Sequence, residues 1–219
     1  MLENITLPDY TRKEELINSF SHFAGTLFSI FALVSCIGIS IKTGNKISLI
    51  NSIVYCLSMM LLYTMSGVYH GLNVSDRKKI FRVVDHCSVF VFIAGSFTPV
   101  LLGDLRNVYP ERNYILFVSV WLLCVVGIIL NAVNFPKFKN ISIIFYVAIG
   151  WLIIFEFRPL YEHYGAKSAI LLLAGGLVFS IGTILYNVGK KKRYFHSIFH
   201  FFVLAGSVIH YFVITTYIL

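Results

Sequence analysis

The chain has 219 residues, of which 58% are hydrophobic and 13% are charged, and its mean hydropathy is +0.80. Soluble domains are typically about 45–50% apolar and about 25% charged, so this composition excludes an ordinary soluble domain and indicates a membrane protein. The formal net charge of +8 could suggest nucleic-acid binding, but the Lys and Arg residues lie in short loops between apolar runs. We therefore expect membrane lipids as the partner and no nucleic acid.

Residues 1–19 are polar and mixed in charge, and we expect them to form a cytoplasmic segment at the membrane interface. Thr11 followed by Glu14 is typical of a helix N-cap with a capping box. Residues 20–219 are expected to form a single domain, an all-α integral membrane protein with seven transmembrane helices. The apolar stretches of spanning length are residues 20–41, 47–70, 83–102, 114–133, 141–157, 167–188 and 196–218.

The distribution of the 18 Lys and Arg residues predicts the orientation of these helices. Most of them lie in the N-terminal tail and in the second, fourth and sixth loops, the last of which contains the basic run of residues 190–193. Loops rich in Lys and Arg stay on the cytoplasmic side of a membrane. We therefore predict a cytoplasmic N-terminus and an outside C-terminus, which agrees with an odd number of helices.

This topology brings four potential ligands to one membrane depth. His70 ends the second apolar stretch, Asp85 lies at the start of the third, and His196 and His200 begin the seventh. The last two are four residues apart, so they share one helix face. All four are predicted at the cytoplasmic end, where polar groups in hydrocarbon are costly and usually functional. The sequence therefore predicts a metal site at this end.

Three neutral imidazoles with an open coordination position are typical of catalytic zinc, and imidazole favours zinc over magnesium or calcium. Asp85 could hold a water molecule or accept its proton as a general base, or it could simply cap its helix. Ser66 lies one turn before His70 on the same face. Its hydroxyl could orient the water or donate to a developing oxyanion, or it could serve as a small packing residue.

The remaining polar residues of the helices are weaker candidates. His86 is interpreted as a neighbour of the site or an interfacial residue, and His210, roughly 15 Å deeper than His200, as a buried hydrogen-bonding group. His163 is expected in solvent. Three residues spaced i, i+3 and i+7 share one helical face: Glu15, Asn18 and His22. We expect this face to pack beneath the site and to hydrogen-bond its loops.

Together these residues resemble the three motifs of the progestin and adiponectin receptor family, whose bacterial branch is called haemolysin III. The matching motifs are Glu15-x2-Asn18-x3-His22, Ser66-x3-His70 followed by Asp85, and His196-x3-His200. The resemblance covers nearly the whole chain, and the absence of a long soluble N-terminal domain resembles the bacterial branch. It implies a seven-helix protein of the bacterial plasma membrane with zinc near the cytoplasmic face. It also implies that the three motif histidines at 70, 196 and 200 bind the ion, that Asp85 contacts it through water, and that Ser66 lies close by.

The resemblance also suggests activities. Adiponectin receptors are associated with hydrolysis of ceramide-like amides, and the wider superfamily contains alkaline ceramidases. The first hypothesis is therefore a zinc-dependent hydrolase of a membrane lipid amide or ester. The second is a receptor or sensor of membrane-lipid state with a structural zinc ion. The third is a pore-forming haemolysin, which is disfavoured because charged residues are almost absent from the interiors of the apolar stretches.

Overall fold

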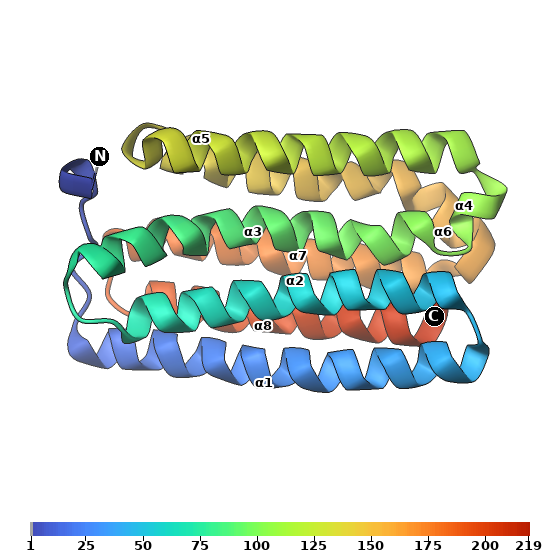
Figure 1. Ribbon diagram of the computed structural model, residues 1–219, viewed down its shortest axis with the longest axis horizontal. Helices are drawn as coiled ribbons and strands as arrows, with labels where there is room; N and C mark the ends of the chain where they lie inside the picture. Colours follow the sequence, from blue (N-terminus) through green and yellow to red (C-terminus); the bar gives the residue numbers. More distant parts are fainter. Residues whose placement is uncertain (1) are drawn as a thin grey trace.

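The computed structural model describes residues 2–219 as a bundle of helices whose axes run roughly along its long direction (Figure 1). Within that range there is no strand, and six helices are long and apolar enough to cross a membrane. They are α1 (Arg12–Thr43), α2 (Lys46–Gly71), α3 (Asp76–Leu102), the segment Pro110–Tyr164, α7 (Ala166–Gly189) and the segment Phe195–Ile218. The shorter elements are η1 (Leu2–Asn4), α4 (Leu105–Val108), η2 (Trp151–Glu156), α6 (Phe157–Tyr164) and η3 (Ile214–Ile218), and the last long segment begins as α8 (Phe195–Val213).

The difference between six helices and the seven predicted stretches lies in α5 (Pro110–Gly150). A straight helix of its 41 residues would be about 60 Å long, twice the thickness of a bilayer core of about 30 Å. The helix instead reverses at Asn134, whose backbone is non-helical (φ −150°, ψ 77°), as Figure 1 shows. The Asn134 side chain accepts from Lys137 N–H at 3.3 Å and so caps the second limb. Ser142 donates to Asn131 across the turn at 2.7 Å, so α5 is a hairpin of two antiparallel limbs.

The start of α1 has the predicted capping box, which is confirmed. The Thr11 hydroxyl accepts from Glu14 N–H at 3.3 Å, and the Glu14 carboxylate accepts from Thr11 N–H at 2.9 Å. Further along, Ser19 donates to the carbonyl of Gly67 at 2.8 Å, which joins α1 to the end of α2. Gly25 lets the two helices approach closely, because a Cβ there would collide with the ring of Tyr63.

The outward faces of the bundle are apolar and its interior contains polar groups. On α1, Phe20, Leu27, Phe31 and Val34 are 60–70% exposed. A contiguous apolar face of this kind is unfavourable in water and favourable in lipid. Many buried side chains are instead polar or charged. The fold is therefore that of a multi-span membrane protein.

One end of the bundle collects the starts of α1, α3 and α8 and the end of α2, at the left of Figure 1. We call it the histidine end, because His70, His196 and His200 lie there. The N-terminal residues that precede α1 also fold over this end. The histidine end is therefore the place where the predicted site residues can meet.

Candidate metal centre

Three histidines from α2 and α8 meet in the interior of the histidine end. His70, His196 and His200 are 3%, 7% and 1% exposed, and each offers a ring nitrogen within 4.8 Å of the others. The Nε2 atom of His196 lies 3.3 Å from that of His70 and 3.1 Å from that of His200. Nitrogens bound tetrahedrally at about 2.0–2.1 Å from one zinc ion would be separated by about 3.3 Å. The spacing of these atoms therefore fits a shared metal ion.

The opposite ring nitrogens explain why the Nε2 atoms are available as ligands. His70 Nδ1 lies 2.6 Å from a carboxylate oxygen of Glu15, and His200 Nδ1 lies 3.2 Å from the carbonyl oxygen of Asn18. Oxygens of these kinds accept hydrogen bonds, so each Nδ1 carries the proton and each Nε2 has a free lone pair. Two lone pairs that converge in a buried site repel each other unless a cation lies between them. The chemistry of the donors therefore fits a metal ion.

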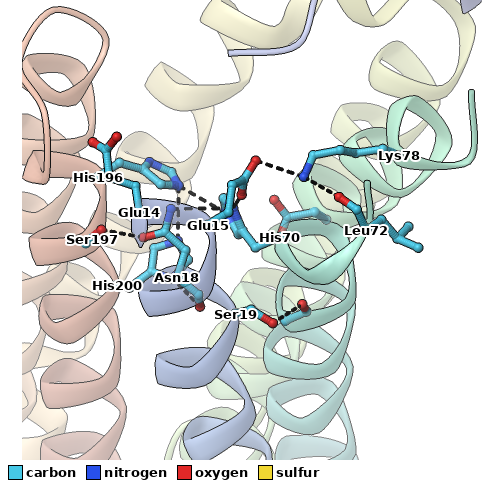
Figure 2. A network of polar contacts seen from close by, with 12 residues as sticks. Glu14, Glu15, Asn18, Ser19, His70, Leu72, Lys78, His196, Ser197 and His200 are labelled. Atoms are coloured by element: carbon cyan, nitrogen blue, oxygen red, sulfur yellow. Dashed lines mark hydrogen bonds and ion pairs between the residues drawn. The ribbon is translucent and has the colours of Figure 1, made fainter. Parts of the chain in front are cut away.

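Glu15 and Asn18, which contact these imidazoles, have hydrogen-bond partners of their own, as Figure 2 shows. Lys78 donates to the second carboxylate oxygen of Glu15 at 2.8 Å and to the carbonyl of Leu72 at 2.8 Å. The side-chain oxygen of Asn18 accepts from the hydroxyl of Ser197 at 2.6 Å. Outer hydrogen bonds of this type fix ligand orientation and tautomer in metal sites. The centre thus has an ordered outer layer drawn from α1, α3, α8 and Leu72, which follows the end of α2.

His196 is held differently from the other two imidazoles. Its Nδ1 atom is buried and has no hydrogen-bond partner anywhere in residues 2–219. Its ring instead stacks on Tyr10, with ring centroids 4.9 Å apart and planes at 21°. Burial raises the pKa of Tyr10 above its ordinary value, so the side chain is a neutral phenol rather than an anionic ligand. Tyr10 therefore contacts the centre through its ring.

Ser66 and Asp85 line a cavity of about 200 Å³ whose wall also includes His196 and His200. Ser66 is 2% exposed, and the side chain of Asp85 is 16% exposed. The cavity continues from His196 and His200 through the bundle to His210. Most of its remaining wall is apolar, including Phe92, Phe97, Leu172, Phe179 and Val203. The catalytic roles of Ser66 and Asp85 remain predictions.

The other histidines lie outside the three-histidine group. His86 Nδ1 donates to the carbonyl of Arg82 at 2.9 Å, and its ring lines the cavity, so it neighbours the site. His210 Nε2 lies 3.1 Å from the carbonyl of Leu172, which confirms the predicted buried hydrogen-bonding role. His163 is exposed on α6, as expected.

The predicted face of α1 contributes more directly than expected. Glu15 and Asn18 contact the imidazoles themselves, rather than the loops beneath the site. His22 stacks on His200 with ring centroids 3.6 Å apart. The expectation that this face packs against the site is therefore confirmed, but its hydrogen bonds go to the candidate ligands.

Sequence reasoning missed four contributors: Tyr10, Ser21, Lys78 and Ser197. Ser197 follows a predicted ligand, and Ser21 lies one residue before His22 and contacts His200 Nδ1 at 3.3 Å. Lys78 was counted only as a loop charge, although its place near the start of α3 put it at the predicted depth of the site. Tyr10 precedes the first helix, so no periodicity pointed to it.

The fold and this centre define a class: a multi-span membrane protein with a buried three-histidine group that could hold a metal ion. A family model described as "Haemolysin-III related" matches residues 10–211. The chain belongs to this haemolysin III family. It is 36% identical to the "Hemolysin-3 homolog" of Bacillus subtilis (strain 168), covering 95% of this chain and 96% of the relative. It is 35% identical to "Hemolysin-3" of Bacillus cereus, covering 100% of this chain and 98% of the relative.

A more distant relative extends the similarity to animals. The human "Monocyte to macrophage differentiation factor" is 26% identical over 75% of this chain and 69% of its own length. The similarity therefore extends from bacterial proteins to a human protein.

Proposed function

We propose that this protein binds zinc at His70, His196 and His200 and hydrolyses an amide or ester of a membrane lipid. The observation that supports the proposal is that two of the three grouped imidazoles, His196 and His200, line a mostly apolar cavity whose wall also contains Ser66 and Asp85. An apolar cavity with a few polar groups at one end suits a lipid whose polar linkage reaches those groups. Membrane lipids are thus the proposed partners.

The proposed topology has seven crossings, because each limb of the α5 hairpin is counted separately. The first limb, residues 110–133, and the second, residues 135–150 continued by η2 and α6, each have the length of a span. The N-terminus is cytoplasmic and the C-terminus outside in this proposal, since the Lys- and Arg-rich loops favour it. The candidate metal centre then lies near the inner headgroups.

The proposed chemistry divides between the ion and the chain. When bound, zinc would polarise a substrate carbonyl and activate water. Asp85 holds a water molecule by a hydrogen bond and accepts its proton as general base. Ser66, which lines the same cavity as Asp85, orients the water or directs its hydroxyl toward a developing oxyanion. The apolar wall excludes bulk water from the reacting linkage.

A direct test uses the purified protein in phospholipid vesicles that contain ceramide, with release of free fatty acid and bound zinc measured on the same samples. The proposal expects one zinc per chain, turnover that stops on chelation, and a D85N variant that keeps zinc but loses about 100-fold or more in rate. A control variant, H163A, changes an exposed histidine and should match the parent. Zinc without turnover on any amide or ester lipid tested would contradict hydrolysis but not metal binding.

A second candidate function is a receptor or membrane-lipid sensor in which zinc only ties helices together. The observation that favours it is the cover over the centre, since Pro8 and Tyr10 contribute to the cavity wall at the histidine end. X-ray absorption on the zinc-loaded protein separates the two functions. An exchangeable water beside three imidazoles supports hydrolysis, whereas a fourth protein ligand with no water supports the structural role.

A further inference from the structure

The three imidazoles of the candidate centre are not equally secured. His70 and His200 each have an oxygen acceptor at Nδ1, at 2.6 and 3.2 Å, whereas Nδ1 of His196 is buried without a partner among residues 2–219. A metal-binding imidazole normally donates its other ring N–H to an acceptor that sets its orientation. At its Nδ1 side, the ring of His196 is therefore held by packing and by no hydrogen bond.

The ring that stacks most nearly parallel on His196 comes from outside the helical bundle. Tyr10 lies nearly parallel to its ring at 4.9 Å and 21°, whereas Tyr186 and Phe199 meet it at steeper angles of 59° and 43°. Tyr10 also approaches the ring of His70 at 5.8 Å. A stacked aromatic pair is worth about 0.5–1.5 kcal/mol beyond its buried area, enough to select one ring orientation.

Tyr10 belongs to a short segment, residues 5–10, which we call the N-terminal strap. Ile5 is 4% exposed, and the guanidinium of Arg82 donates to the carbonyl of Thr6, so α3 holds one end of the strap. The buried side chain of Ile5 and the hydrogen bond from Arg82 to Thr6 thus fix the strap before it reaches the centre. Pro8 and Tyr10 then form part of the cavity wall.

The other end of the strap is tied to the helix that carries His196. Glu14 accepts from Thr11 N–H at 2.9 Å with one carboxylate oxygen and from Tyr194 N–H at 2.7 Å with the other. Tyr194 directly precedes α8 and has a left-handed backbone (φ 64°) that turns the chain into this helix. A single carboxylate therefore links the residue after Tyr10 to the residue two before His196.

We propose that Tyr10 is the positioning residue for His196, and that the N-terminal strap thereby completes the metal centre and closes it at the histidine end. The inference rests on the proposed metal centre. While the strap is seated, the three Nε2 atoms converge. When the strap leaves, His196 loses the group that orients its ring, and the centre opens to solvent.

The experiment compares Y10A and Y10F with the parent, each loaded with Zn²⁺ and, in parallel, with Co²⁺. Y10F keeps the stacked ring, so it should match the parent. Y10A should bind zinc about 10-fold more weakly in competition with a chelator, a loss typical of an outer-layer change. It should also alter the visible Co²⁺ spectrum, which reports the coordination geometry. The control D9N changes an exposed neighbour in the strap and should leave both readouts unchanged.

A metal-free arm keeps this inference separate from the metal centre itself. Diethyl pyrocarbonate modifies accessible imidazoles, and mass spectrometry locates the product. In metal-free protein, Y10A should be modified severalfold faster at His196, with no change at His210. I5S, which loosens the strap but keeps Tyr10, should show the same effect more weakly. A parent that binds no metal contradicts the proposed function. Y10A and I5S proteins that equal the parent in reactivity at His196 overturn the role of the strap.

Discussion

Two glutamates at opposite ends of the bundle, the half-buried Glu15 and the buried Glu156, form ion pairs of different kinds. At the histidine end, Glu15 accepts from Lys78 with one carboxylate oxygen and from His70 with the other, at 2.8 and 2.6 Å. Near α6, Glu156 is fully buried and accepts from Arg112 at 2.9 Å with one oxygen. Its second oxygen has no partner among the residues that the structure describes.

The difference lies in what each carboxylate holds. Arg112 starts the first limb of the α5 hairpin and Glu156 follows the second, so this pair joins the two limbs. Glu15 instead orients an imidazole whose other nitrogen faces the candidate metal centre. The Arg112–Glu156 pair therefore stabilises the hairpin, whereas the Lys78–Glu15 pair supports the candidate metal centre. The comparison can be tested, because metal affinity and unfolding are separate measurements.

The largest expected effect is the loss of metal from an H200A variant. Removing one of three ligands should weaken zinc binding by more than about 100-fold, since two imidazoles cannot complete the set. The matched control is H210A, which removes a buried imidazole from the same helix but keeps the three-histidine group. Isothermal titration with Zn²⁺ in detergent measures both. Equal affinities in the two variants would contradict the assignment of the centre.

The central prediction compares the two glutamates directly. E15Q removes the charge that holds His70 Nδ1, so zinc affinity should fall by about 10–100-fold, the usual effect of an outer-layer partner. E156Q makes the same chemical change at the other end and should leave zinc affinity unchanged. Chelator competition on both purified variants gives the answer. A comparable fall in E156Q would mean that general loosening of the bundle, rather than orientation of the imidazole, weakens the metal.

The next prediction concerns the Arg112–Glu156 pair, which should affect the free energy of unfolding and not zinc affinity. R112A leaves the carboxylate of Glu156 buried without its cation, which should cost about 1–3 kcal/mol of unfolding free energy, a figure reduced for the partial exposure of the arginine. The control R158A breaks the exposed pair with Glu162 and should leave stability unchanged, because solvent screens this pair. Denaturant titration in detergent measures both. Zinc affinity should remain that of the parent in each.

Much of the fold followed from the sequence, because bilayer thickness fixes the length of an apolar stretch. The predicted stretch 114–133 corresponds to the first limb of α5, and the stretch 141–157 corresponds to its second limb and η2. The stretch lengths did not use Asn134 and Pro136, the residues at which the structure makes that turn. The predicted positions of the helix ends likewise placed His70 and His196 at the same end of the bundle.

The outer layer of the site could not be predicted in the same way. Contacts such as Glu15 with His70, 55 residues apart, depend on how α1 rotates against α2, and helical periodicity alone does not set that rotation. The stacking of Tyr10 on His196 depends on the path of a segment without periodicity. Periodicity thus identified the candidate ligands, whereas tertiary packing determined what holds them.

The smallest expected effect belongs to Lys78, which acts on the centre only through Glu15. K78M keeps a long side chain but removes the charge, so Glu15 loses one of its two partners while its bond to His70 remains. Zinc affinity should fall by less than about 10-fold, below the effect of E15Q, because the change lies one contact further from the ligand. The control K79M removes the neighbouring lysine, which pairs with the exposed Asp76. Combining K78M with E15Q should add nothing to E15Q alone, because the path through Glu15 is already broken. A full additive loss in the double variant would show instead that Lys78 acts on the centre by its own charge.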